Sequence, residues 1–295
     1  MVPAGDLGRR SEPSAPRLAG GTRHVLGLDV GWSTVRRSSA ACLLSWDAAQ
    51  VEARIVRFTA HPAEYRPVLR DLIGGRRLAA AAFDGPLRGD LAEIGLYRTA
   101  ERLMTVGLAR HIGKPGQCNS PNGRLLNRAA NAYAGDVLAI AEVAPASHAA
   151  AIHDRAIAEA FPTSFLGCML DRGFREPGRA RSDSYFLRLA GDPRGCRLTA
   201  LVRRLLPGRA LGFAPGTIRD HDERAALVCA VTALCVAVRA YVAVGDAQGR
   251  IILPPRATGG QPGLQDWAWA ILAAGAAADG AALIAETVPC LPDRA

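Results

Sequence analysis

Four acidic residues occupy positions that are unusual for surface carboxylates. Asp29 and Asp84 each end an apolar segment, Glu159 stands inside a third apolar segment, and Asp222 lies at the start of a predicted helix. An isolated buried charge costs several kcal/mol or more, so we expect these side chains to point into a site rather than into the core. The simpler interpretation is that each acid bonds its own turn or favours a helix N-terminus.

Acids gathered at one edge of a sheet would repel one another unless cations neutralised them. Oxygen-only ligands suit Mg²⁺ or Mn²⁺ and not zinc. Two such ions about 3.5–4 Å apart can activate water and stabilise the leaving oxygen in phosphodiester hydrolysis. We therefore predict that Asp29, Asp84, Glu159 and Asp222 are catalytic, metal-binding residues of a hydrolase.

The spacing of apolar residues predicts the elements that position these acids. Three successive short strands indicate an antiparallel meander, and later buried strands carry Asp84 and Glu159. On the helix predicted over 220–241, Asp222 shares one face with small residues suited to close packing on a sheet. The remaining predicted elements are strands at 25–29, 40–44, 51–59, 78–83, 156–161 and 251–253, and helices at 62–73, 92–108, 119–141, 164–170 and 198–206 and from about residue 264.

Three basic residues are candidates for substrate phosphate contacts. Arg98 and Arg102 lie on the helix predicted over 92–108, and Lys114, the only lysine, lies in a Gly/Pro-rich loop. A solvated ion-pair face on the helix and an ordinary turn at Lys114 are the alternatives.

Composition bounds the class of protein. The chain has 295 residues and a net charge of +9, which favours an acidic partner such as nucleic acid. Its seven cysteines are scattered without a Cys-x-x-Cys pair, as is typical of cytoplasmic proteins. Residues 1–22 are rich in Gly, Pro, Ser and Arg and are predicted to be a disordered leader. With no convincing membrane-spanning segment, we predict a cytoplasmic protein that does not bind membranes.

The order of these elements resembles the ribonuclease-H-like fold. Four short segments, over about residues 24 to 245, resemble a bacterial family of predicted nucleases known as domain of unknown function family 429. They are Gly27-Leu28-Asp29-Val30-Gly31, Phe83-Asp84-Gly85-Pro86-Leu87, Glu159-Ala160-Phe161-Pro162-Thr163 and Asp222-Glu223-Arg224-Ala225-Ala226-Leu227. The resemblance implies a metal-dependent nuclease. Many ribonuclease-H-like proteins carry a further acid where this chain has Ala225, so metal binding by the helix depends on Asp222.

We therefore expect an α/β protein with a five-stranded mixed sheet flanked by helices. The expected divisions are the leader 1–22, a ribonuclease-H-like domain at 23–245, and a C-terminal extension at 246–295 packed on the same domain.

Two other functions stay open. The segment 26–34 also resembles the first phosphate loop of sugar kinases and other actin-like ATPases, although we find no second related domain in the sequence. A non-catalytic module that keeps the fold and binds nucleic acid or a protein is the other alternative.

Overall fold

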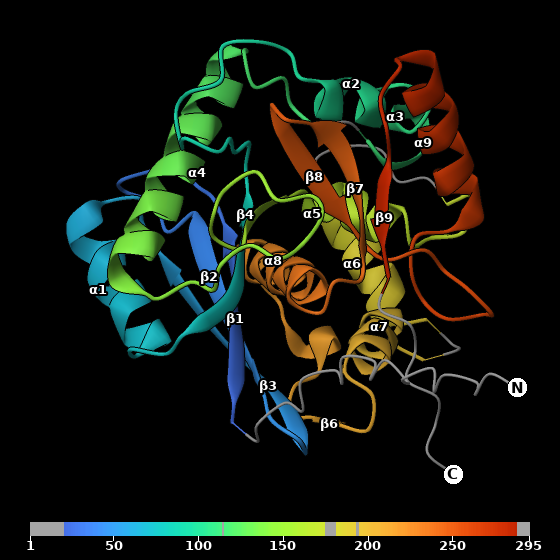
Figure 1. The fold of residues 1–295 in the computed structure, drawn as a ribbon. Coiled ribbons are helices and arrows are strands. Elements are labelled where there is room, and N and C mark those ends of the chain that lie inside the picture. The colour runs from blue at the N-terminus through green and yellow to red at the C-terminus, as the bar shows by residue number, and fades with distance from the viewer. Residues whose placement is uncertain (1–20, 114, 175–180, 193–194, 288–295) are drawn as a thin grey trace, which may run out of the picture.

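The computed structural model describes residues 21–113, 115–174, 181–192 and 195–287 (Figure 1). These residues form an α/β protein built on one mixed sheet. Its strands are β1 (Arg23–Asp29), β2 (Ser39–Trp46), β3 (Gln50–Phe58), β4 (Leu78–Asp84), β5 (Ile157–Ala160), β6 (Ala210–Leu211), β7 (Tyr241–Asp246), β8 (Gly249–Leu253) and β9 (Ile284–Glu286). Its helices are α1 (Pro62–Ile73), α2 (Thr99–Thr105), α3 (Ala109–Ile112), α4 (Pro121–Ile140), α5 (Pro162–Gly167), α6 (Arg181–Ala190), α7 (Arg197–Leu205), α8 (His221–Ala237) and α9 (Asp266–Ala278), with a short 3-10 helix at Pro215–Thr217.

The sheet has nine strands in the described part of the chain, in the order β6-β3-β2-β1-β4-β5-β8-β7-β9. Strands β1, β4, β5 and β8 are parallel, and β2 runs antiparallel between β1 and β3. The expectation of five strands is therefore wrong. The β7–β8 hairpin extends the sheet because β8 pairs with the otherwise open edge of β5, and the expected boundary after residue 245 falls inside that hairpin.

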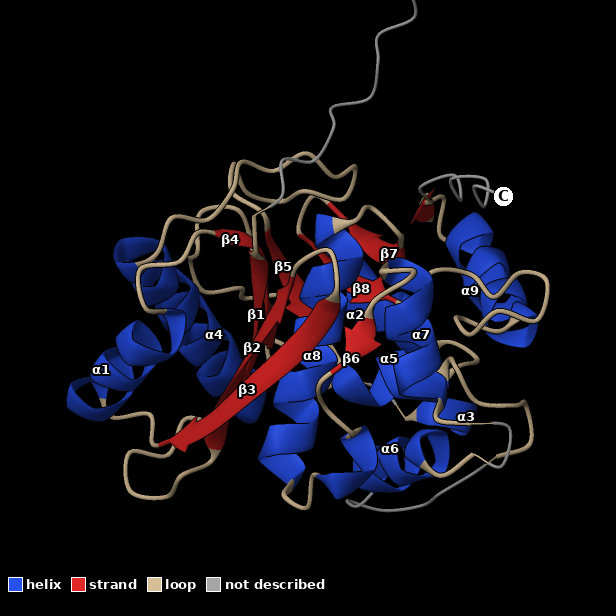
Figure 2. Ribbon diagram, turned by 90° about the horizontal axis from the view of Figure 1, so that it is seen from below, coloured by secondary structure: helices blue, strands red, loops and turns tan. Residues whose placement is uncertain are grey.

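Helices cover both faces of the central strands (Figures 1 and 2). One face carries α1 and α4, which contact β2, β3 and β4. The other carries α8, which packs on β1, β2 and β4, with α5, α6 and α7 around it. Residues 225–236 of α8 are all buried, so this helix is enclosed between the sheet and the outer helices.

Gly27 allows α8 to approach β1 closely. A Cβ atom on Gly27 would lie 1.9 Å from the backbone nitrogen of Ala230 and 2.5 Å from the carbonyl oxygen of Ala226. The two backbones are thus separated by less than a methyl group, and only glycine fits between them. Since residues of a strand alternate between its faces, Asp29, two positions after Gly27, also lies on the α8 face.

The predicted helix over Pro62–Ile73 is confirmed residue for residue. His61 caps its first turn by accepting a hydrogen bond from the Ala63 nitrogen, and Gly74 ends it in the left-handed conformation. By contrast, the helix predicted over 92–108 is wrong in extent, since only α2 is helical between residue 92 and Thr105. The helix predicted to reach residue 241 ends at Ala237, because β7 begins at Tyr241.

No helix in the described ranges combines the length and the apolar character needed to cross a membrane. Six cysteines of those ranges carry free thiols, and five of these thiol-bearing residues are buried. Nearly all of the predicted leader, residues 1–20, lies outside the described residues.

Replacing Gly27 tests the close contact between α8 and β1. We expect Gly27→Val to lower the free energy of unfolding by about 3 kcal/mol, because the side chain would force α8 off the strand. Gly135→Ala is the matched control: its Cβ meets nothing within 4 Å inside α4, and alanine there should stabilise by about 0.5–1 kcal/mol. Urea denaturation measures both, and equal stability of Gly27→Val and wild type would contradict the contact.

Candidate functional site

Asp29 and Asp84 lie directly beside each other. Each is the last residue of its strand, and the two are register partners in the parallel β1–β4 pair. Register partners in a parallel pair point to the same face, so both side chains lie on the α8 face. The sequence prediction that these two acids meet at one edge of the sheet is therefore consistent with the register.

The two aspartate side chains are half-buried, and each carboxylate repels further negative charge. Burial raises the pKa of Asp29 well above its ordinary value, and the nearby carboxylates of Asp84, Asp222 and Asp220 raise it further, against an opposing effect of Arg57. Burial and the charge of Glu159 raise the pKa of Asp84 to about 7, although His221 and a side-chain hydrogen bond with Asp29 oppose this. Among the described residues, neither Asp29 nor Asp84 forms an ion pair.

The thiol of Cys229 covers the pair from α8. Burial raises its pKa well above the ordinary thiol value, and the charges of Asp84 and Asp29 add to the effect. Cys229 is therefore a neutral, buried group, which keeps that side of the carboxyl pair out of water.

Asp222 lies near the pair but is held by Arg57. The Arg57 Nη2 is 2.7 Å from Asp222 Oδ2, and its Nη1 is 2.8 Å from Asp220 Oδ2. Asp220 is also the N-cap of α8, since its side chain accepts hydrogen bonds from the backbone nitrogens of Asp222 and Glu223. Arg57 thus ties β3 to the first turn of α8, and its charge partly offsets the acids beside Asp29.

Glu159 does not join this group. Its register partner is Phe83, the neighbour of Asp84, so its side chain lies on the opposite face of the sheet. There Arg98 holds it in a two-pronged ion pair, with Nη1–Oε2 and Nη2–Oε1 both 2.8 Å, and the Leu87 nitrogen donates to it as well. A carboxylate occupied in this way is not free for a metal, and we leave Glu159 out of the proposed metal set.

Arg98 is likewise unsuited to the predicted phosphate contact. Its side chain has no exposed surface and also contacts Glu101, with Nη2–Oε1 at 3.1 Å. Burial alone lowers the pKa of Arg98, but the carboxylates of Glu159 and Glu101 raise it more, so the guanidinium stays charged. The ion pair instead fixes the segment 86–98 against β5.

The other two predicted phosphate contacts are not part of this group of residues. Arg102 lies on α2, half exposed, and its Nε is 2.9 Å from Asp279 Oδ2 near α9. Lys114 lies outside the described residues.

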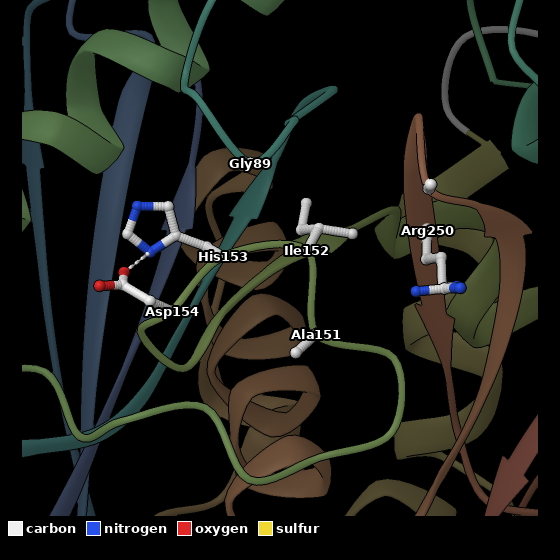
Figure 3. A pocket seen from close by; sticks show the side chains of 7 residues that line it. Gly89, Ala151, Ile152, His153, Asp154 and Arg250 are labelled. Carbon is white, nitrogen blue, oxygen red and sulfur yellow. Dashed lines mark ion pairs between the residues drawn. The ribbon is translucent and has the colours of Figure 1, made fainter.

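An open pocket of about 700 Å³ lies between the segment 151–154 and the turn that joins β7 to β8 (Figure 3). Gly89, Ile152 and Arg250 are among its lining residues, together with His153, whose Nδ1 is 2.7 Å from Asp154 Oδ1. None of the four predicted acids lines it.

Asp29 and Asp84 fit a magnesium site in which the protein supplies only two carboxylates. Among the described residues, no group of three or more His, Cys, Asp or Glu side chains is arranged to hold a metal ion. Mg²⁺, however, is commonly held by one or two carboxylates with water and substrate phosphates completing its shell. Asp29 and Asp84 meet that requirement, because a cation would relieve the repulsion that raises their pKa values.

Sequence reasoning missed the role of Arg57. In the sequence it stood out only as one polar residue of a half-buried strand, although its register through Ala40 places it on the same face of the sheet as Asp29. No sequence pattern links it to acids more than 160 residues later, with which it pairs only because β3 and the start of α8 meet in space.

Comparison with known proteins gives no assignment: no family model, no curated protein and no solved structure matches this chain.

The buried ion pair between Arg98 and Glu159 predicts a large loss of stability when only one of the two partners is removed. Arg98→Met should lower the free energy of unfolding by about 3–5 kcal/mol, because Glu159 is then left buried and unpaired. Adding Glu159→Gln to that variant should recover at least about 1 kcal/mol. Urea denaturation of both variants measures this, and a double variant less stable than Arg98→Met would contradict the pairing.

The raised pKa values of Asp29 and Asp84 predict that the free energy of unfolding falls as pH rises. Between pH 4 and 7 the folded protein keeps a proton on the Asp29–Asp84 pair that the unfolded chain has lost, so each step upward in pH favours unfolding. Asp84→Asn should match wild type at pH 5 and exceed its free energy of unfolding by about 2 kcal/mol at pH 8, without divalent cations.

Denaturation at the two pH values measures the difference. Asp90→Asn, which alters an exposed carboxylate paired with Arg88, is the control and should follow wild type at both. Parallel behaviour of Asp84→Asn and wild type would show that the pair carries no such proton.

Proposed function

We propose that this protein is a metal-dependent phosphodiesterase of the nuclease type, with a ribonuclease-H-like fold and with Asp29 and Asp84 as the metal-binding carboxylates. The observation that carries the proposal is the placement of these two carboxyl groups, side by side at the carboxyl ends of neighbouring parallel strands, with raised pKa values and no ion pair among the described residues. Carboxyl ends of parallel strands are the usual place for ligands in α/β sheets.

The strand arrangement supports the proposed fold. The meander β1–β2–β3, the acid-bearing strand β4 parallel to β1, the later strand β5 and the acid-bearing helix α8 occur in the order from which the resemblance was drawn. Strands β6, β7, β8 and β9 extend this central part on both sides.

The chemistry assigned to the chain's own residues is limited to binding and orientation. Mg²⁺ or Mn²⁺, when bound, supplies charge neutralisation and activation of a water molecule. Asp29 and Asp84 would hold the cation at a fixed place, and Cys229 with the buried face of α8 keeps bulk water from one side of it. Asp222 stands close enough to affect the pKa of Asp29, but it is ion-paired with Arg57 and is not counted among the metal ligands.

Mn²⁺-dependent hydrolysis of bis(p-nitrophenyl) phosphate and of labelled DNA and RNA oligonucleotides tests the proposal. Asp29→Asn and Asp84→Asn should each lower the rate by about 100-fold or more, because each removes a ligand oxygen. Asp90→Asn should keep the wild-type rate. Calorimetry should show Mn²⁺ binding to wild type at pH 8, and binding at least about tenfold weaker in Asp29→Asn.

Two results would overturn the proposal. One is metal-independent hydrolysis that survives both substitutions. The other is stabilisation of the protein by ATP without any hydrolysis of phosphodiesters, which would favour the kinase-like alternative.

A further inference from the structure

The loop that directly follows Asp29 exposes an unusual set of side chains. In residues 30–38, which join β1 to β2, Trp32 is 46% exposed and Val35 is 88% exposed. Arg36 and Arg37 are exposed in the same loop, and Arg37 forms a long ion pair with Glu64, Nε–Oε1 3.5 Å, which is weak at a surface and open to exchange for a phosphate. Large apolar groups on a surface are informative where they gather with charged groups beside a candidate site.

The loop is fastened at several points. The Gly31 nitrogen donates to Ser39 Oγ at 3.0 Å, and the Ala60 nitrogen donates to the Ser33 carbonyl at 2.7 Å. Trp32, which lies between these two anchored positions, is therefore held in a defined place while its side chain is exposed to solvent. Because the main chain on both sides of Trp32 is already ordered, binding through its ring costs little backbone conformational entropy.

The guanidinium of Arg57 joins this loop to Asp222, next to the carboxyl pair. Arg57 Nη2 donates to the Arg37 carbonyl at 2.5 Å and to Asp222 Oδ2 at 2.7 Å. Asp222 in turn raises the pKa of Asp29. The exposed tryptophan and the arginines thus border the corner of the sheet that holds the carboxyl pair.

We infer that residues 30–38 bind single-stranded nucleic acid, with Trp32 stacking on one base and Arg36 and Arg37 contacting phosphates. An exposed aromatic ring interleaved with basic side chains is the usual composition of a single-strand platform. In a duplex the base faces are already stacked, so Trp32 can reach a base face only in an unpaired strand. The inference rests on the proposed function, because it supplies the phosphodiester that Asp29 and Asp84 would act on.

The test measures binding without cleavage. A fluorescein-labelled oligothymidylate of about 20 nucleotides is titrated with the full chain in EDTA, followed by anisotropy, beside a duplex of the same length. Wild type should bind the single strand more tightly than the duplex. Trp32→Ala should weaken single-strand binding by about 5- to 100-fold, whereas Trp32→Phe should keep it within about threefold.

Salt dependence separates the arginines from the tryptophan. Replacing both Arg36 and Arg37 by alanine should reduce the slope of log K against log salt by about 1.4, while Trp32→Ala should leave the slope unchanged. Arg77→Ala is the matched control. Its residue is an exposed arginine just before β4, at the strand end opposite to Asp84, and the variant should bind within about twofold of wild type.

Four outcomes would overturn the inference: no binding of the oligonucleotide, equal binding by Trp32→Ala and wild type, preference for the duplex, or Trp32-dependent binding to vesicles of phosphatidylcholine and phosphatidylserine in place of the oligonucleotide. Failure of the nuclease proposal is distinct, since it would appear as normal binding with no Mn²⁺-dependent cleavage.

Discussion

The enforced closeness of Asp29 and Asp84 is the constraint on which the rest of this structure depends. Two acids in register on adjacent parallel strands cannot move apart, because the backbone hydrogen bonds of β1 and β4 fix their separation. Helix α8 closes over the same face, and the contact with Gly27 sets how closely it does so. The fold therefore half-buries the pair without supplying an ion-pair partner among the described residues. That arrangement reduces stability unless a cation or a shared proton compensates it.

The charged groups around the sheet fall into two sets with different roles. On one face, Arg98 is enclosed with Glu159 and Glu101, and every partner is buried. Such a set fixes the path of the chain after β4 and has no room for exchange with solvent. On the other face, Arg57, Asp220 and Asp222 are all partly exposed. Their ion pairs are weaker and can rearrange, as a binding site requires.

Sequence reasoning succeeded where a local pattern determines the outcome. The runs that end in Asp29 and Asp84 predicted two buried strands, and their parallel pairing brought the acids together. The prediction that Glu159 joins the other acids failed. A shift of one residue in strand register moves a side chain to the other face of the sheet, and register cannot be deduced from the sequence of one strand. Arg98 was misjudged for a similar reason: the helix predicted around it begins only at Thr99, and its partner Glu159 is 61 residues away. The strand at 251–253 was predicted, but its partner β7 was not, because the run up to residue 241 was assigned to the preceding helix.

The two ends of the sheet have a consequence for the protein in concentrated solution. In the described part of the chain the outermost strands are β6, with two residues, and β9, with three. Because β6 pairs only with Gln50 and Val51, most of β3 has no strand partner on that side in the described residues. The exposed charged side chains of Glu52 and Arg54 on this part of β3 disfavour the addition of a strand from another copy, and so oppose fibrillar assembly.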